Sequence, residues 1–430
     1  MLLRPRPLFI LKRFLQISLL LLSVFLVGEG LWGNQFAPAS LTTQFVWVHY
    51  RGLLIFSLLL LGNLFCFACP FVFVRDLLRL FVSPKFLFPQ KLRNKWTAIL
   101  LFSLILFFYE AFALWSSPYQ TALLMAGFFA AALIIDGLFK QASFCKYVCP
   151  VGHFNFLTSA LSPGEVKIKS ESICADCKTL DCLKGNEERR GCELNLFLPK
   201  KSGNFDCTFC MDCVDACPSG NIELSRVLPG QTLETEIYRS GIGKIETRKD
   251  FQFAILTFFF LGFLNAFMMT APAQNFRAFV HPFFPNELLL IAITFLFFAL
   301  VLPFLFFYFP AKLMKQSASD SIVALLPLGV GLWSAHYSFH FLTGLLAFTP
   351  LLGINLSTKW MGLSPSQAVP VEMGLLFLGA LISFFLLWKK QKKTLMKYYS
   401  LALFITLTAF CFWILLQPMQ MRSTFVGVMP

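Results

Sequence analysis

The sequence predicts an all-α polytopic membrane protein with a small polar domain inserted between two groups of helices. Hydrophobic residues make up 57% of the 430 residues, charged residues only 13%, and phenylalanine alone occurs 54 times. Too few polar side chains remain to cover a water-soluble globule of this size, so the expected solvent is lipid. One long polar stretch, 140–250, interrupts the apolar runs, and eight of the 13 cysteines fall within it between Cys174 and Cys217.

Nine apolar runs approach the roughly 20 residues that a helix needs to cross the hydrocarbon layer. We expect transmembrane helices at 12–31, 50–69, 96–115, 120–139, 251–271, 288–309, 321–348, 371–388 and 398–417. These runs divide the chain into a four-helix region with the first Cys-Pro motif (1–140), a polar domain (141–250) and a five-helix region (251–430).

The basic residues predict how these helices are oriented. With the N-terminus in the cytoplasm, all but four of the 36 Lys and Arg residues lie on the inner side; the four are Arg51, Arg277, Lys359 and Arg422. The positive-inside rule favours this arrangement. We therefore expect a multi-pass protein of the cytoplasmic (inner) membrane, with the N-terminus and polar domain cytoplasmic and the C-terminus outside. The net charge of +14 then matches anionic lipid headgroups and does not indicate nucleic-acid binding.

Four cysteines of the polar domain have the spacing of an iron–sulfur motif. Cys207, Cys210, Cys213 and Cys217 form C-x2-C-x2-C-x3-C, followed by Pro218. In this run three closely spaced thiolates hold one face of a [4Fe-4S] cubane, and the fourth usually reaches a second cluster. A zinc ribbon would need two C-x2-C pairs with a longer spacer. The spacing therefore favours iron–sulfur ligation.

A second set of four cysteines precedes this run. Cys174, Cys177, Cys182 and Cys192 have the spacing C-x2-C-x4-C-x9-C. Two cubanes need eight thiolates and the domain supplies eight, so we expect a small α+β, ferredoxin-like 2[4Fe-4S] domain. The crossover rule would group Cys174, Cys177, Cys182 and Cys217 around one cluster, and Cys192, Cys207, Cys210 and Cys213 around the other. Structural zinc or free thiols are the alternative for the earlier set.

Two shorter cysteine motifs lie at the expected membrane edge. Cys66 and Cys69, followed by Pro70, end the second expected helix, and Cys145 and Cys149, followed by Pro150, come after the fourth. Each continues into a similar stretch that closes in Ser-Pro, which indicates a twofold internal repeat. We expect these four cysteines to form a third metal or redox-active thiol centre, either a further Fe–S centre or reactive thiols. Plain buried cysteines and a structural disulfide are the alternatives. Cys411, in the last helix, is expected to be a core residue.

The order of these motifs resembles the membrane-bound polyferredoxins of the NapH, NosR and CcoG group. The resemblance covers about 50–225 and is carried by the segments SFCKYVCPVGHFNF and DCTFCMDCVDACP. It implies electron transfer between the membrane and a redox partner, often starting from quinol. Three features depart from the family pattern. The first motif is C-x2-C-P instead of C-x3-C-P, no extracytoplasmic flavin-binding domain is present, and the rear five helices have no counterpart in the short NapH form.

Ionisable residues in the membrane helices mark another candidate site, because such groups are costly in lipid. His336 and His340 lie one turn apart on one face of the seventh expected helix. Three interpretations stay open: ligands of haem b, a quinol or proton-handling site, or packed histidines. His49 and His281, expected on the outer side, could contribute. Glu110 in the third helix is a candidate for a proton path.

We expect an electron-transfer protein that connects a membrane donor or acceptor, with quinol favoured, to a reductase, oxidase or cytochrome through two [4Fe-4S] clusters. It could be the electron-transfer or quinol dehydrogenase subunit of an oxidoreductase, and no catalytic nucleophile is evident in the polar domain. The alternative is an accessory protein that reduces or loads a metal cofactor for a respiratory oxidase or reductase. Met419, Met421 and Met429 could then touch copper.

Overall fold

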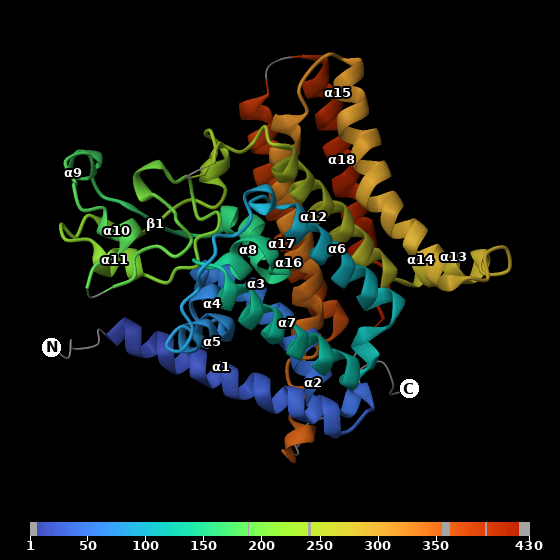
Figure 1. Ribbon diagram of the computed structural model, residues 1–430. Helices are drawn as coiled ribbons and strands as arrows, with labels where there is room; N and C mark the ends of the chain where they lie inside the picture. The colour runs from blue at the N-terminus through green and yellow to red at the C-terminus, as the bar shows by residue number, and fades with distance from the viewer. Residues whose placement is uncertain (1–6, 188, 240–241, 355–361, 392–393, 421–430) are drawn as a thin grey trace. The chain divides into compact units, whose positions relative to one another are not determined.

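The computed structural model describes residues 7–187, 189–239, 242–354, 362–391 and 394–420, and it confirms the predicted fold class (Figure 1). Within these residues, eight helical segments are long and apolar enough to cross a membrane. They are Phe9–Trp32, Leu41–Leu61, Pro118–Leu138, Lys249–Met268, Glu287–Leu313, Ser319–Thr343, Pro365–Lys390 and Leu395–Leu415. A further apolar helix, Trp96–Ala111, lies where the third span is predicted but has only 16 residues.

The secondary structure is mostly helical, with two small sheets. The α-helices are α1 (Pro7–Trp32), α2 (Leu41–Gln44), α3 (Tyr50–Leu61), α4 (Leu64–Phe67), α5 (Pro70–Leu78), α6 (Trp96–Ala111), α7 (Pro118–Leu138), α8 (Pro150–Thr158), α9 (Glu171–Ala175), α10 (Asp181–Lys184), α11 (Asp212–Ala216), α12 (Lys249–Met268), α13 (Ala271–Val280), α14 (Glu287–Leu296), α15 (Phe309–Leu313), α16 (Ser319–Thr343), α17 (Pro365–Lys390) and α18 (Leu395–Leu415). The strands are β1 (Gly164–Ile168), β2 (Ile222–Arg226), β3 (Tyr238–Arg239) and β4 (Gly243–Lys244).

The chain forms two compact units that alternate along the sequence. The first unit comprises Met1–Phe25, Phe56–Ala98 and Met125–Asp250, and the second comprises Leu26–Ile55, Ile99–Leu124 and Phe251–Pro430. Several long helices contribute one end to each unit. The division of the chain at residues 140 and 250 stays a prediction.

The first unit contains the cysteine-rich segment, whose two ends are held together by a small sheet. Strand β1 pairs antiparallel with β2, from Gly164 opposite Arg226 to Ile168 opposite Ile222. Because β1 precedes the cysteines and β2 follows them, this pairing brings the start and the end of the segment side by side. Buried Val166 and Ile222 pack there with Phe209 and Cys213. The sheet therefore positions the eight cysteines within one compact region.

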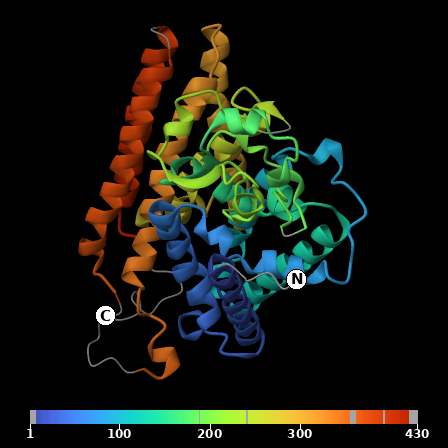
Figure 2. The ribbon, with the colours of Figure 1, turned by 90° about the vertical axis from the view of Figure 1, so that its left-hand side faces the viewer.

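The second unit is built around α16, a helix that is buried along most of its length. Helices α17 and α18 pack against it, as Figures 1 and 2 show. The approach to α17 is close because glycines face each other: a Cβ on Gly331 would lie 3.4 Å from the Leu376 Cα, and one on Gly379 only 2.5 Å from the Pro327 carbonyl oxygen. Small residues at such crossings let helix backbones approach in a membrane.

The second span differs from its prediction over 50–69. The structure has a continuous helical segment over Leu41–Leu61, and Gly62 ends it with a left-handed φ of +75°. His49 and Arg51 consequently lie inside this span and not beyond its outer end. The His49 ring nitrogens lie 3.1 Å from the Gln44 carbonyl oxygen and 3.2 Å from that of Leu345. The Arg51 guanidinium lies over the Trp47 and Tyr109 rings.

Candidate functional site

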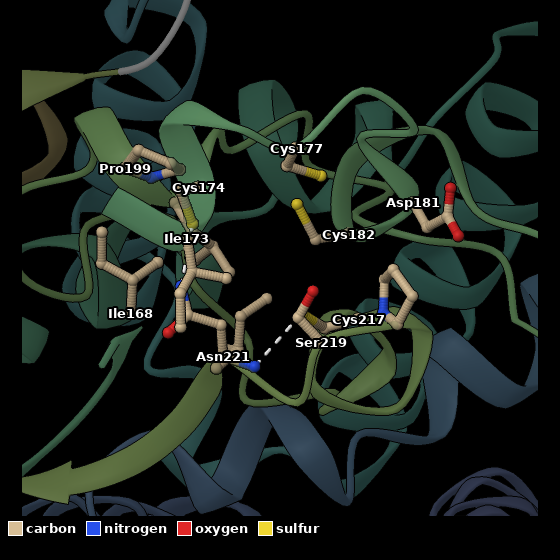
Figure 3. Close-up of a pocket in the computed structure, with 13 residues that line it drawn as sticks. Ile168, Ile173, Cys174, Cys177, Asp181, Cys182, Pro199, Cys217, Ser219 and Asn221 are labelled. Atoms are coloured by element: carbon tan, nitrogen blue, oxygen red, sulfur yellow. Dashed lines mark hydrogen bonds between the residues drawn. The ribbon is translucent and has the colours of Figure 1, made fainter. Parts of the chain in front are cut away.

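Four cysteines surround one small pocket in the first unit. Cys174 lies on α9 and Cys182 on α10, Cys177 lies between these two helices, and Cys217 follows α11. Figure 3 shows the Cys177 and Cys182 sulfur atoms pointing toward each other across the opening. This is the group of four that the crossover rule predicts for one cluster.

Amide groups donate hydrogen bonds to two of these sulfurs. The Asn221 side-chain amide donates to Cys174 Sγ at 3.2 Å, and the Asn221 backbone N–H donates to Cys217 Sγ at 3.3 Å. Hydrogen bonds of this kind stabilise negative charge on sulfur. The backbone between Cys177 and Cys182 is also unusual, since Leu180 has a left-handed φ of 57°. Such a conformation is uncommon for a bulky residue and is often found at functional sites.

The remaining four cysteines of the polar domain form a second group in the same unit. Burial raises the pKa of the Cys213 thiol, and the nearby Cys207 and Cys192 raise it further. Burial likewise raises the pKa of Cys210, and Cys192 and Cys213 contribute in the same direction. The Leu196 N–H donates to Cys192 Sγ at 3.4 Å. Cys192 thus lies near both Cys210 and Cys213, and Cys207 and Cys182 also lie near Cys213. The assignment of Cys192, Cys207, Cys210 and Cys213 to one cluster stays a prediction.

The two Cys-Pro motifs have the same local geometry, which agrees with the predicted repeat. Cys69 and Cys149 each precede a nine-residue helix that begins with proline, α5 and α8, and their backbone angles nearly coincide: φ −62° and ψ 124° for Cys69, φ −60° and ψ 120° for Cys149. The second motif has one more residue between its cysteines. That residue is accommodated in a π-helical turn over Phe144–Val148, where the Cys149 N–H donates to the Phe144 carbonyl oxygen at 2.8 Å.

The four cysteines of these motifs lie close to one another. Burial raises the pKa of Cys149 to about 12, and Cys69 adds to this effect. Burial also raises the pKa of Cys66, with contributions from Cys69 and Cys149. Burial raises the pKa of the Cys145 thiol, and Asp136, Cys149 and Cys69 raise it further. The four thiols form two pairs that lie more than 70 residues apart in the sequence, and the structure brings the two pairs together.

Two polar residues of α5 and α8 serve these motifs, and sequence reasoning missed both. The Asn155 side-chain amide donates to Cys66 Sγ at 2.9 Å, so a residue from the second repeat binds a cysteine of the first. Arg75 occupies the equivalent place in α5, five residues after the proline, and forms an ion pair with Glu193 at 2.6 Å. A polar residue five positions after the proline in both helices is the signal that could have identified them.

Buried ion pairs connect α5 with the loop that carries Cys192. Glu193 pairs with Arg79 at 2.7 Å as well as with Arg75. Asp76 pairs with Arg13 at 2.7 Å and with Arg190 at 2.8 Å. Although burial opposes the charged form, Arg75 and the other arginines lower the pKa of Asp76 to about 2. The loop before Cys192 is thereby fixed to the helix that follows Cys69.

A second buried pair lies next to Cys207. Lys95 Nζ binds Asp206 Oδ1 at 2.7 Å, and Arg239 also pairs with Asp206. Burial lowers the pKa of Lys95 to about 8 despite this partner. Asn63 adds a direct contact, because its side-chain amide donates to the Cys207 carbonyl oxygen at 2.6 Å. These contacts fix the start of the ferredoxin run.

The donor sets fit iron–sulfur clusters better than single ions. Among the described residues, no three His, Cys, Asp or Glu side chains converge as they would around one metal ion. A cubane is larger than an ion, because its cysteines bind four separate corners, so its ligands lie further apart. All 13 cysteines are free. Where burial raises the thiol pKa, as at Cys149, Cys210 and Cys213, cluster binding has to displace a proton from the sulfur.

The structure places the other predicted residues mostly in the second unit. His336 and His340 are both buried on α16 with ring centroids 5.0 Å apart, and His340 Nε2 lies 3.1 Å from Met269 Sδ. Their three interpretations stay open. Glu110 is buried near the end of α6, and Cys411 is fully buried, as expected of a core residue. Of the three methionines that could touch copper under the alternative function, Met421 and Met429 lie outside the described residues.

Comparison with known families identifies part of the chain. Two segments, 44–89 and 121–169, match a family described as a 4Fe-4S binding domain. Both Cys-Pro motifs lie within the matched segments, whereas Cys174–Cys217 does not. The match gives the class of this site: a 4Fe-4S binding domain in a multi-pass, helical membrane protein.

Two curated proteins are similar to parts of the chain. The uncharacterized protein MJ0749 of Methanocaldococcus jannaschii is 26% identical over 176 residues, which cover 38% of this chain and 65% of that protein. The putative electron transport protein YccM of Escherichia coli K12 is 34% identical over 86 residues, 20% of this chain and 22% of that protein. The chain thus covers less than two thirds of either relative. No solved structure matches.

Proposed function

We propose that this protein transfers electrons between the membrane and a redox partner through two [4Fe-4S] clusters in its first unit. One cluster would be held by Cys174, Cys177, Cys182 and Cys217, and the other by Cys192, Cys207, Cys210 and Cys213. The observation that supports the proposal is the pocket lined by Cys174, Cys177, Cys182 and Cys217, with amide donors on Cys174 and Cys217 and a further donor on Cys192. The similarity to a putative electron transport protein supports the same function.

We further propose a third centre at Cys66, Cys69, Cys145 and Cys149. The match of both motifs to a 4Fe-4S binding domain supports an iron–sulfur centre there over plain buried cysteines. Asn155 would donate to the Cys66 sulfur, and the Gly152 N–H would donate to the Cys149 sulfur at 3.3 Å. A bound cluster supplies one-electron chemistry, and these donors, together with burial, would tune its potential.

Quinol is the donor or acceptor that we favour in the membrane, and a reductase, oxidase or cytochrome is the partner. The N-terminus and the cysteine-rich region would face the cytoplasm, because 32 of the 36 Lys and Arg residues (36 minus the four named above) then lie inside. An impermeant thiol reagent tests this orientation: in intact spheroplasts it should leave a cysteine introduced at exposed Ser317 unmodified and label one introduced at Asn286.

Iron quantitation and low-temperature EPR on the purified, full-length protein test the clusters. Two cubanes require about eight irons per chain, and a third would bring the total to about twelve. The Cys210→Ser variant should lose one EPR signal and about four irons. Cys411→Ser is the matched control, since Cys411 is a buried cysteine of the last helix and should retain all iron.

Intact protein without iron and acid-labile sulfide would refute the proposal, and an unchanged spectrum of Cys210→Ser would refute the assignment of that residue. Reduction of the clusters by a soluble quinol analogue tests the membrane donor separately. Clusters that form but accept no electrons from the quinol would exclude quinol as the donor and leave the clusters established.

A further inference from the structure

The helix core of the second unit contains polar side chains that the proposed electron transfer does not use. Glu372 on α17 is fully buried, and neither of its carboxyl oxygens has a hydrogen-bond partner among the described residues. The same holds for the hydroxyls of Ser334 and Ser338 on α16 and for the side chain of Asn265 on α12. Buried polar groups normally have partners, and ionisable groups in a membrane core usually mark a functional site.

The contacts between α16 and α17 place Glu372 beside the two serines. The helices run antiparallel: Leu328 N–H donates to Ser383 Oγ at 2.8 Å, and Gly331 lies against Leu376. Glu372 precedes Leu376 by four residues, one turn along the same face. Ser334 and Ser338 follow Gly331 by three and seven residues, so they continue the face of α16 that meets α17. The carboxyl group and both hydroxyls therefore share one helix–helix contact.

A second polar pair lies at the same height on the α12 side of α16. Trp333 Nε1 donates to the Phe258 carbonyl oxygen at 2.9 Å, and His340, further along α16, contacts Met269 at the end of α12. Because both contact residues advance in the same direction, the two helices run parallel. In this register Asn265 is level with His336, and Ser334 and Ser338 flank that level. The polar groups thus gather in one layer of an otherwise apolar helix bundle.

The ligand that fits Glu372 is a proton. The residue has no exposed area, so the carboxyl group is shielded from bulk water. Among the described residues no three His, Cys, Asp or Glu side chains converge to hold a metal ion. A charged carboxylate without hydrogen bonds is strongly disfavoured in such an environment. The neutral acid carries no charge, and its O–H group can donate a hydrogen bond to a serine hydroxyl oxygen.

We propose that Glu372 is a proton-binding site in the helix core of the second unit, on the α17 face that packs against α16 near Ser334 and Ser338. The step is the addition of one proton to the carboxylate to give the carboxylic acid, and its reverse; no electron is involved. The titratable residues nearest to the two serines along α16 are His336 and His340. The inference goes beyond electron transfer and holds whether or not the first unit binds clusters.

Carbodiimide labelling of the full-length protein in lipid nanodiscs tests the proposal. Dicyclohexylcarbodiimide adds to a protonated carboxyl group that is shielded from water, and the acylurea that forms retains all atoms of both reactants. Peptide mass spectrometry should find the adduct on Glu372. Glu287 is the matched internal control, because its side chain is 60% exposed and pairs with Arg277, and it should remain unmodified.

Infrared spectroscopy provides a second measurement. The wild-type protein should show a protonated-carboxyl C=O band at neutral pH that is missing from Glu372→Gln and retained in Glu287→Gln. Absence of the adduct on Glu372 in the wild-type protein, or an unchanged carboxyl band in a folded Glu372→Gln variant, would overturn the proposal. The labelling needs no substitution, so it decides the question even where the variant fails to fold.

Discussion

Individual amide groups determine the electrostatics of the cysteine sites. Asn221 contacts two sulfurs of one group, and Asn155 contacts Cys66 of the Cys-Pro motifs. An N–H group aimed at a sulfur stabilises the more negative, reduced state of a cluster. The reduction potential of each centre should therefore depend on a single side-chain amide.

We predict that Asn221→Leu lowers the reduction potential of the cluster at Cys174, Cys177, Cys182 and Cys217. Loss of one hydrogen bond corresponds to a shift on the order of 20–60 mV for a one-electron couple. An EPR-monitored redox titration measures it. Asn94→Leu is the control, since its side-chain amide donates to the Lys91 carbonyl oxygen and to no sulfur. An unchanged potential in an Asn221→Leu variant with full iron content would contradict the prediction.

Gly152 is required by close packing at the second Cys-Pro motif. A Cβ there would lie 2.5 Å from the Cys145 carbonyl oxygen and 3.3 Å from the Cys149 Cβ. We predict that Gly152→Ala destabilises the protein by about 1–3 kcal/mol, the usual cost of overpacking. Gly127→Ala on α7 is the control, because a Cβ there has nothing within 4 Å and should be neutral or slightly stabilising. Thermal unfolding in detergent compares the two, and equal midpoints would disprove the packing argument.

The sequence predicts which transmembrane helices form better than it predicts where each helix begins and ends. The apolar runs identify the spans because lipid demands length and hydrophobicity, which are properties of composition. Boundaries depend on single residues. Gly62 ends the second span at Leu61, and Ser364 with Pro365 caps α17 six residues before its predicted start at residue 371. Glu372 therefore lies well inside a helix, although the predicted boundary puts it at the very end.

The ion pairs that anchor α5 predict acid sensitivity. The pKa of Asp76 is about 2 in the folded protein instead of 3.8, because Arg75, Arg190 and Arg13 together outweigh the effect of burial. A lowered folded-state pKa stabilises the protein at pH above about 3.8, and this contribution, about 2 kcal/mol, is lost as the pH falls toward 2. We predict that Asp76→Asn is less stable than the wild-type protein at neutral pH and loses less stability on acidification.

Unfolding midpoints measured from neutral pH down to about 2 test this prediction. Glu171→Gln changes an exposed carboxyl group in the first turn of α9 and should keep the wild-type acid dependence. Parallel curves for the wild-type protein and Asp76→Asn would show that the arginines around Asp76 contribute nothing to this dependence.

For the whole molecule, ligand motifs with a fixed residue spacing can be predicted from the sequence, whereas the roles of single polar residues cannot. The crossover rule predicts the grouping of the eight cysteines from their spacing. Asn155, Glu372 and Asn265 form no spaced motif. Asn155 contacts Cys66 from a distant part of the sequence, and Glu372 and Asn265 are buried by helix packing, so only the folded chain reveals their environments.

Removal of iron should affect the two units differently. Cluster binding at the eight cysteines would supply folding energy to the short strands and helices around them. We predict that chelation makes the segment 164–239 sensitive to limited proteolysis and leaves α16–α18 intact. Mass spectrometry of the fragments locates the cuts. Equal protection of 164–239 with and without iron would mean that this region folds independently of its clusters.

The wider turn at Phe144–Val148 lets the two halves of the repeat differ in length by one amino acid without changing the geometry at the proline that follows. An insertion or deletion at this point is therefore structurally mild, and related chains should show both spacings in either half. Pattern searches that require a constant gap between the paired cysteines will overlook such chains, whereas searches that accept a gap of two or three residues will find them.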